Sequence, residues 1–315
     1  MSKQEATIEI LKQKKRPPGR PPKGPPKKQL PRGGISMKPT FDSNIMELKY
    51  ETPVVFKRIF NLCKQMAVKN ITFEFDNSFI KMKSSDHFNK NYNLLTINCT
   101  KLNHYYCKFP YSITINSKIL ETIFKKIDRN YDSITIVSKE SNLYESINII
   151  FNNRQLATEE YHILNLVENN ENISNKIINE LDYLSYPVKF ELSSKFFKKV
   201  ISDIASFNQD THEQIFTIEK IKGIPLQFTY NTVSKTIRAY TVFKDTNKIK
   251  LVSSVTDEDI FSVSIKIINI KPLSNSPITE NIKFYVDSYR DIVFKLDIDN
   301  GTFEFLIFTE IMKSY

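Results

Sequence analysis

Basic side chains that share one face of a helix are the groups of this sequence best suited to do chemistry. Over residues 52–66 apolar residues recur at helical spacing, and the opposite face carries Lys57, Arg58 and Lys64. Lysine and arginine on a solvent-facing helix contact phosphate oxygens without reading bases. For any single lysine the simpler interpretation is an ordinary solvated helix face.

Groups that usually carry catalysis are scattered along the chain. The four histidines are isolated, and His87 has no other His or Cys at metal-ligand spacing. Beyond residue 40 the only glycines are Gly223 and Gly301, so a Walker or Rossmann phosphate loop cannot form. No Gly-x-Ser-x-Gly elbow occurs. The sequence therefore predicts a protein that is not an enzyme and needs no metal or cofactor.

Cysteine usage and hydropathy point to the inside of a cell. Cys63, Cys99 and Cys107 share no CxxC spacing and are expected to be free thiols in a reducing compartment. The chain has no uncharged apolar run of about 18 residues, and residues 1–40 do not resemble a secretory leader. We therefore expect an intracellular protein that does not enter a membrane.

The positive charge is concentrated at the start of the chain. The sequence holds 45 basic and 35 acidic residues, and residues 1–40 account for eleven of the basic and two of the acidic ones. The same 40 residues hold eight of the 14 prolines and four of the six glycines. Such a segment buries too little apolar surface to fold alone. We predict a disordered, basic, proline-rich tail over residues 1–40, followed by a nearly neutral body.

A short motif in the tail resembles an AT-hook, which lays an arginine-bearing strand into an A·T-rich minor groove. The motif is Gly19-Arg20-Pro21, and Pro18 stands where such hooks usually carry an arginine. DNA contact is predicted for Arg16, Arg20 and Lys23. A solubilising arm, a nuclear-import signal and a polyproline ligand are the alternatives.

The body repeats itself. From residue 45 it is rich in alternating β patterns, and Phe56-Lys57-Arg58-Ile59 recurs as Phe197-Lys198-Lys199-Val200 after a similar short strand. Residues 112–137 and 261–286 form a second, weaker pair of strand–helix–strand patterns. The expected fold is α+β, with two topologically similar domains of antiparallel sheets and short helices along one face. The boundaries are 41–164, a connector at 165–185, and 186–315.

Over residues 45–312 the body resembles sliding clamps of the proliferating cell nuclear antigen (PCNA) type. The resemblance is carried by six phrases in family order: Val55-Phe-Lys-Arg-Ile-Phe, Met82-Lys-Ser-Ser-Asp-His87, Ser117-Lys-Ile-Leu, Tyr161-His-Ile-Leu-Asn-Leu, Leu192-Ser-Ser-Lys-Phe-Phe-Lys-Lys-Val-Ile and Ser264-Ile-Lys-Ile-Ile-Asn. Leu102-Asn-His-Tyr-Tyr106 and Ile127-Asp-Arg-Asn130, together with the tail, look closer still to clamp-like proteins of large DNA viruses. This resemblance implies a DNA polymerase processivity factor that encircles duplex DNA and tethers replication and repair proteins.

The resemblance also implies where DNA would lie. In the family, short helices line the pore of the ring. The positions that match carry basic side chains: Lys57, Arg58, Lys64, Lys118, Lys125, Lys195, Lys198, Lys199 and Lys266. A lysine or arginine that binds phosphate releases counterions, so binding is expected to weaken with salt.

Clients and neighbouring subunits are the other expected partners. Family clients, DNA polymerases among them, insert a short peptide into a groove below the connector, and a clamp loader is a further expected partner. The matching groove residues are His87, Phe88, Leu181, Leu184, Leu306 and Phe308. Subunits of a head-to-tail homotrimer would join by adding edge strand to edge strand. The resemblance implies edges at residues 144–151 and 248–255, with contacts from Tyr144, Ile147, Ile149, Phe151, Ile249, Leu251 and Ser253.

Two other function classes remain open from the residues. A clamp relative without a closed ring would hold DNA by charge alone, as a processivity or transcription accessory factor. The near-neutral body and the basic tail suit that interpretation, because a strongly acidic outer surface would keep DNA off the rim. A basic-tailed scaffold with no DNA role is the third class. For a viral member of the family the expected site is the viral replication site in the host cytoplasm, or the nucleus.

Overall fold

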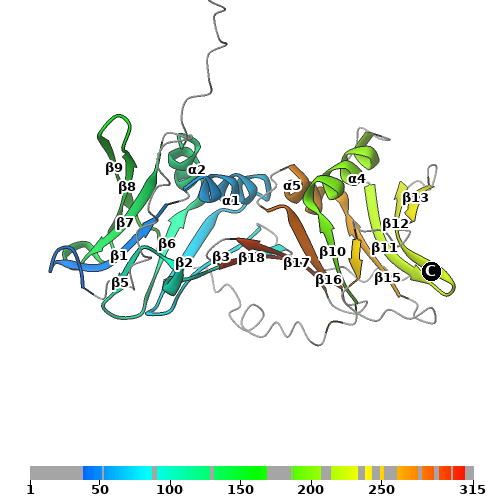
Figure 1. Ribbon diagram of the computed structural model, residues 1–315, viewed down its shortest axis with the longest axis horizontal. Coiled ribbons are helices and arrows are strands. Elements are labelled where there is room, and N and C mark those ends of the chain that lie inside the picture. Colours follow the sequence, from blue (N-terminus) through cyan, green and yellow to red (C-terminus); the bar gives the residue numbers. More distant parts are fainter. Residues whose placement is uncertain are drawn as a thin grey trace, which may run out of the picture. The chain divides into compact units, whose positions relative to one another are not determined.

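A strand–helix unit that occurs twice organises the chain. The computed structural model describes residues 38–308 except for positions 52, 87–90, 128–130, 169–185, 187, 207–213, 233–237, 243–248, 252–260, 276–278, 287–290 and 299–300. Residues 1–37 of the predicted tail, Arg16, Arg20 and Lys23 included, lie outside these residues, as does most of the connector. The two halves of the described chain are shown in Figure 1.

The first half contains nine strands and two α-helices among the described residues. They are β1 (Asn44–Tyr50), α1 (Val54–Gln65), β2 (Asn70–Phe75), β3 (Phe79–Ser85), β4 (Asn91–Asn98), β5 (His104–Cys107), β6 (Tyr111–Asn116), α2 (Ser117–Lys125), β7 (Ser133–Lys139), β8 (Ser146–Asn153) and β9 (Thr158–Asn165).

The second half follows the same order. Its elements are β10 (Val188–Ser193), α4 (Ser194–Ser206), β11 (Gln214–Ile221), β12 (Ile224–Thr232), β13 (Arg238–Val242), β14 (Ile249–Leu251), β15 (Phe261–Lys266), α5 (Ile267–Asn275), β16 (Asn281–Val286), β17 (Asp291–Ile298) and β18 (Gly301–Phe308). Every described pairing between strands is antiparallel. The α+β fold class with two similar halves, predicted from the sequence, is confirmed.

One sheet crosses from the second half into the first. Its strand order is β14-β10-β16-β17-β18-β4-β3-β2-β6, and the crossing is the ladder between β18 and β4. The other two sheets have the orders β5-β1-β7-β8-β9 and β13-β12-β11-β15. The first five strands of the long sheet therefore repeat the β5-to-β9 sheet, and its last four repeat the β13-to-β15 sheet.

Buried residues at equivalent strand positions show which residue of the first half corresponds to which residue of the second. Leu48 of β1 and Phe190 of β10 occupy the same core position, and the strand registers carry this match through each sheet. By this correspondence β9 is the counterpart of β18, and β13 is the counterpart of β4. Within the described chain, β18 and β4 pair with each other, whereas β9 and β13 each end a sheet.

The crossing ladder depends on a glycine. A Cβ atom at Gly301 would lie 1.9 Å from the carbonyl oxygen of Thr96 and 2.9 Å from the Cα of Ile97. Only a residue without a side chain fits this close approach of two backbones. Thr158 is the residue of β9 that corresponds to Gly301, and it is exposed.

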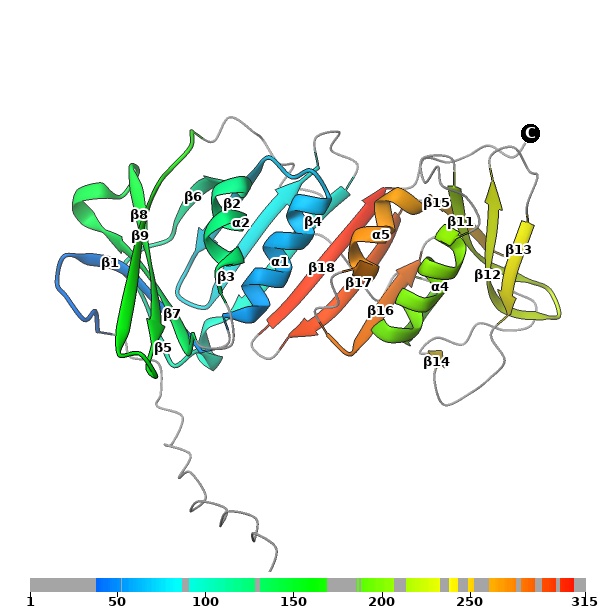
Figure 2. The ribbon, with the colours of Figure 1, turned by 90° about the horizontal axis from the view of Figure 1, so that it is seen from above.

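The helices pack against one face of the sheets and enclose the core between helix and sheet. Figure 2 shows α1, α2, α4 and α5 together on one side of the described chain. Amphipathic spacing explains their packing: α1 buries Phe56, Ile59 and Phe60, and α2 buries Leu120 and Phe124. These rings meet, since the centroids of Phe60 and Phe124 are 4.6 Å apart. α2, α4 and α5 begin directly after a strand and α1 begins shortly after β1, and with the apolar face of each helix packed on the sheet its polar face points away from it.

Candidate nucleic-acid interface

The four helices form one row of neighbours. α2 lies beside α1, α1 beside α5, and α5 beside α4. Together their sequences carry nine basic residues and two acidic ones. The basic residues are Lys57, Arg58, Lys64, Lys118, Lys125, Lys195, Lys198, Lys199 and Lys271, and the acidic ones are Glu121 and Asp203. Helices that are far apart in the sequence thus assemble a single basic face.

The remainder of the body has the opposite charge. Residues 41–315 hold 34 basic and 33 acidic residues, so 25 basic and 31 acidic residues remain once the helices are set aside. The near-neutral body is therefore a basic helix row and an acidic remainder that almost cancel. The net positive charge of the body is thus carried by the helices, and such a basic face suits a nucleic-acid contact.

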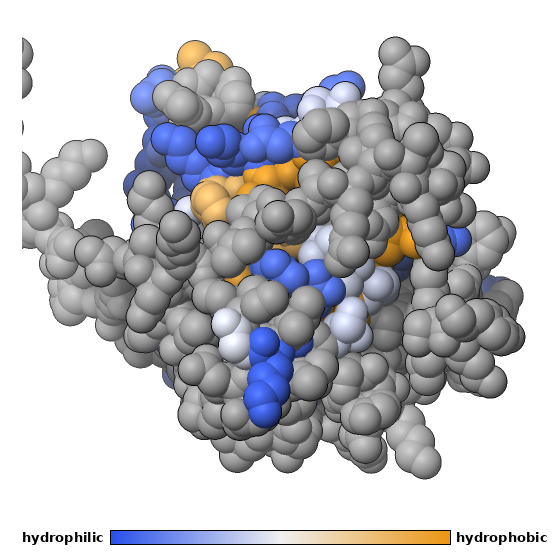
Figure 3. Space-filling view, turned by 90° about the vertical axis from the view of Figure 1, so that its right-hand side faces the viewer, coloured by the Kyte–Doolittle hydropathy of each residue, from blue (hydrophilic) through white to orange (hydrophobic). Residues whose placement is uncertain are grey.

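Most of the predicted DNA-binding residues are exposed on this row. Among the described residues seven of them make no side-chain hydrogen bond or ion pair, and these are Arg58, Lys118, Lys125, Lys195, Lys198, Lys199 and Lys266. Lys195, Lys198 and Lys199 are spaced by three and four residues on α4, so they share one helix face. In the space-filling view of this end of the molecule, hydrophilic residues lie on the upper side, where the helices are, above a strip of apolar residues (Figure 3).

Two predicted residues have partners inside the chain. The Lys57 ammonium donates a hydrogen bond of 2.6 Å to the carbonyl oxygen of Ile127, just beyond α2. The Lys64 ammonium lies 2.9 Å from a carboxylate oxygen of Glu121 on α2. Both side chains thus join α1 to α2, and their charges are partly committed before any DNA arrives. Lys57 is also only half-exposed.

Lys266 differs in its setting from the sequence prediction. The resemblance implies that Lys266 lies on a pore helix, but it is the last residue of β15, and α5 begins at Ile267. The side chain is exposed at the start of the helix row. Sequence reasoning missed Lys271 on α5 and Lys126 at the end of α2. Lys126 could have been found from the sequence, because it directly follows Lys125.

The predicted client groove is described only in part. His87, Phe88, Leu181 and Leu184 lie outside the described residues. Leu306 and Phe308 lie on β18, where Leu306 pairs with Tyr92 of β4 and Phe308 pairs with Asp291 of β17. The client groove therefore stays a prediction, because β18 is the only part of it among the described residues.

The predicted subunit edge in the first half is wrong. β8 contains Ile147, Ile149 and Phe151, and it pairs with β7 on one side and with β9 on the other. Both backbone edges of this strand are therefore occupied within the described chain, and all three side chains are buried. The edge of the sheet is β9, which exposes 65% of Tyr161 and 72% of Ile163. Tyr144 is exposed but precedes the ladder.

In the second half the predicted edge lies at the end of the long sheet. Ile249 and Leu251 belong to β14, which pairs with β10 on one side only. Ser253 lies outside the described residues. The internal repeat makes β14 the counterpart of β5, whereas the counterpart of β4 is β13. A joining surface that copies the β18–β4 ladder would therefore use β13 rather than β14.

A buried carboxylate fixes the point where the tail meets the body. Glu47 accepts hydrogen bonds of 2.7 Å from the amide and the hydroxyl of Thr40, and one of 2.6 Å from the side-chain amide of Asn44. The His104 imidazole lies 2.7 Å from the same carboxylate. Burial raises the pKa of Glu47, but these hydrogen bonds outweigh it, so the pKa lies below its usual value.

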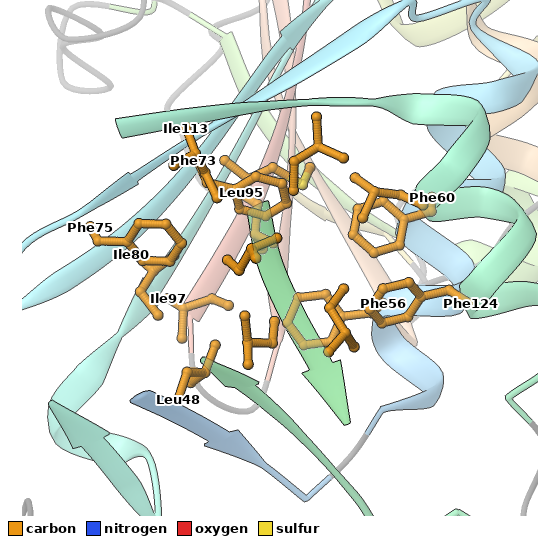
Figure 4. A pocket seen from close by; sticks show the side chains of 16 residues that line it. Leu48, Phe56, Phe60, Phe73, Phe75, Ile80, Leu95, Ile97, Ile113 and Phe124 are labelled. Atoms are coloured by element: carbon orange, nitrogen blue, oxygen red, sulfur yellow. The ribbon is translucent and has the colours of Figure 1, made fainter. Parts of the chain in front are cut away.

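The thiols and the core cavity do not form a reactive site. Cys63 is fully buried, and burial raises the pKa of its thiol to about 12, so the nucleophilic thiolate is scarce at neutral pH. No group of three or more His, Cys, Asp or Glu side chains in the described chain could hold a metal ion. The cavity in Figure 4 is about 20 Å³ and is lined by apolar side chains between the helices and sheets of the first half. It is a packing gap, with no polar group to orient a substrate.

No helix in the described part of the chain combines the length and the apolar character needed to span a membrane.

Comparison with known proteins identifies relatives of the whole described fold. Residues 45–180 match the model of the proliferating cell nuclear antigen N-terminal domain. An uncharacterized protein of African swine fever virus, from tick isolates of South Africa and Malawi, is 29% identical over 294 residues, which span 90% of this chain and 94% of the relative.

Two solved structures are similar to this fold. Proliferating cellular nuclear antigen from Entamoeba histolytica superimposes with a TM-score of 0.68 at 16% identity, covering 85% of this chain and 100% of that one. The PCNA2–PCNA3 complex from Sulfolobus tokodaii gives a TM-score of 0.67 at 13% identity, covering 84% and 99%.

Proposed function

Because the chain is a PCNA-family protein with the PCNA fold, we propose that it is a DNA sliding clamp, a processivity factor that encircles duplex DNA and tethers replication and repair proteins. The observation that carries this proposal is the charge of the helix row, nine basic residues against two acidic ones on a body that is otherwise acidic. Such a face holds a phosphate backbone through many weak contacts, which permits sliding because no base is read.

The internal repeat supports the proposal of a ring. Since β18 pairs with β4 inside the chain, their counterparts β9 and β13 are the strands that would pair between two copies. Transferring the β18–β4 register predicts Tyr161 of one copy opposite Tyr240 of the next, and Ile163 opposite Arg238. A head-to-tail contact of this kind closes when its rotation closes, and a homotrimer is the expected closure.

A charge exchange tests this register. Ile163→Arg places two arginines opposite each other and should shift the protein toward monomer, because like charges across a ladder repel. Arg238→Glu in the same chain should restore the assembly. Phe79→Arg, which adds an arginine at an exposed aromatic of β3, is the matched control. The measurement is the mass in solution by sedimentation at micromolar concentration. A double variant no better assembled than Ile163→Arg would exclude this pairing.

Encirclement is tested by DNA topology. A closed ring stays on circular duplex and leaves when a restriction enzyme opens the circle, whereas a factor held by charge binds linear and circular DNA alike. We expect retention on circles in moderate salt, and its loss on cutting. A fourfold variant, Arg58, Lys118, Lys198 and Lys199 to Glu, should lose both retention and stimulation of a polymerase on long templates. Equal retention before and after cutting would favour the non-ring accessory factor.

Clients and location follow from the same proposal. Replicative partners would bind by short peptides at the groove that includes β18, and a loader would open the ring on DNA. The basic tail would add contacts to DNA outside the pore through Arg16, Arg20 and Lys23. The work of such a protein takes place wherever the DNA is replicated, and for a viral chain this is the viral replication site.

A further inference from the structure

A cluster around Glu160 ties the helix row to the free edge strand. The Lys126 ammonium, at the end of α2, donates a hydrogen bond of 3.1 Å to one carboxylate oxygen of Glu160 on β9. The Tyr131 hydroxyl donates one of 3.0 Å to the other oxygen. The His162 imidazole, on the same strand, lies 2.8 Å from the first oxygen, close enough for attraction although outside hydrogen-bond geometry.

Aromatic side chains hold this cluster against the core. The ring of Phe151 on β8 lies 5.3 Å from His162, 5.6 Å from Tyr131 and 5.6 Å from Phe124 of α2, measured between centroids. Burial raises the pKa of Glu160, but the hydrogen bonds from Lys126 and Tyr131 outweigh it, so the pKa lies below its usual value. The carboxylate is therefore charged at neutral pH and bonded on both oxygens.

At the two corresponding positions the junction inside the chain has apolar side chains, although the neighbouring residue of β18, Glu304, forms an ion pair of 3.2 Å with Lys295 of β17. The strand registers place Phe303 of β18 at the position of Glu160 and Phe305 at the position of His162. Phe305 is fully buried and packs 5.8 Å from Phe294. The permanent β18–β4 junction thus has two phenylalanines where the free edge has an acid and an imidazole.

We infer that Glu160 is a positioning residue that orders β9 for pairing with a second copy, through ionic ties to Lys126 and Tyr131 that salt can weaken, at a position where the β18–β4 junction inside the chain has a phenylalanine. This inference rests on the proposed ring. A strand that is already ordered loses less freedom when a second copy pairs with it, so the ties favour association. Salt screens partly exposed ionic ties but not buried rings, so this order can be weakened without unfolding the chain.

Two variants test the inference in opposite directions. Glu160→Gln keeps the shape and removes the charge, and it should raise the dissociation constant of the assembly roughly fivefold. Glu160→Phe with His162→Phe copies the permanent junction and should lower that constant and slow the exchange of subunits. Glu140→Gln, which removes an exposed carboxylate paired with Lys108 at 3.2 Å elsewhere in the first half, is the matched control.

The decisive readout is the salt dependence of association, measured by sedimentation between low and high sodium chloride, with thermal unfolding of each variant alongside. We expect the slope of the double-phenylalanine variant to be smaller than that of the wild type. Equal slopes in an assembly that forms normally would overturn the role of Glu160 and leave the ring intact. A wild type that is monomeric at every concentration and salt would overturn the ring as well.

Discussion

The two halves of the chain share one frame but use their basic helices differently. In the first half Lys57 and Lys64 bond to Ile127 and Glu121, so part of the charge holds α1 and α2 together. In the second half the three lysines of α4 have no partner among the described residues. The core differs as well, because α2 contributes Phe124 where α5 has Ser274. The first half thus has an aromatic ring at a core position where the second half has a small polar side chain, and the second half commits less of its helix charge to contacts within the described chain.

The largest expected effect tests whether the core positions of Phe124 and Ser274 contribute differently to stability. Phe124 contacts the rings of Phe56, Phe60 and Phe151, so Phe124→Ala should lower the free energy of unfolding by about 3–5 kcal/mol. Ser274 bonds only to the carbonyl of Lys271, so Ser274→Ala should cost about 1 kcal/mol or less. Urea unfolding gives both values. Equal losses would show that the halves are packed alike.

The next effect concerns the strand that joins the halves. Gly301→Ala forces a methyl group into the backbone of β4 and should destabilise the chain by about 1–3 kcal/mol, because one strand must move. Thr158→Ala, at the corresponding position of β9, should change the unfolding free energy by less than about 0.5 kcal/mol. Thermal unfolding of the two variants compares them. A harmless Gly301→Ala would mean that the ladder does not need this close approach.

The salt dependence of DNA affinity tests whether the lysines of α4 contribute more to DNA binding than Lys57 and Lys64 of α1. Lys195, Lys198 and Lys199 replaced together by alanine should reduce the slope of log K against log salt by about 2.7, since each phosphate contact contributes about 0.9. Lys57 and Lys64 replaced together should reduce it by less than about 1, because both are engaged within the chain. Fluorescence anisotropy on a short duplex measures both. The reverse order would make the first half the main DNA contact.

The smallest effect concerns Glu47, whose counterpart in the second half is Lys189. Glu47→Gln should cost about 1 kcal/mol at neutral pH, because charge-assisted hydrogen bonds to Thr40, Asn44 and His104 are lost. The pKa of Glu47 is lowered on folding, so its stabilisation is complete above the unfolded value of 4.5 and fades as pH falls through the folded pKa. The difference in urea midpoint between wild type and variant should shrink below pH 4.5. A constant difference would rule out the charge as its source.

The sequence predicts the repeat and its helices well because both rest on local spacing. Phe56 and Phe197 mark the same core position, and the strand–helix–strand pattern predicted over residues 112–137 contains α2. The resemblance places the free edge on β8 instead of β9, and the sequence pattern offers no correction, because both strands alternate and alternation shows which face of a strand is buried without showing how many neighbours it has. The partners of Lys57 and Lys64 stand 70 and 57 residues away, so only the folded chain could place them.

The hydrogen bonds between Glu47 and Thr40 attach the first 39 residues to the body at a fixed position. With Thr40 held by the carboxylate, those residues become a ligand tethered at a fixed origin, and a short tether gives an effective concentration on the order of millimolar. If the helix row binds a duplex as proposed, a tail whose own affinity for DNA is only millimolar would already be about half bound. Release would then require both contacts to be broken before either re-forms, so the residence time on DNA would lengthen without any tight site.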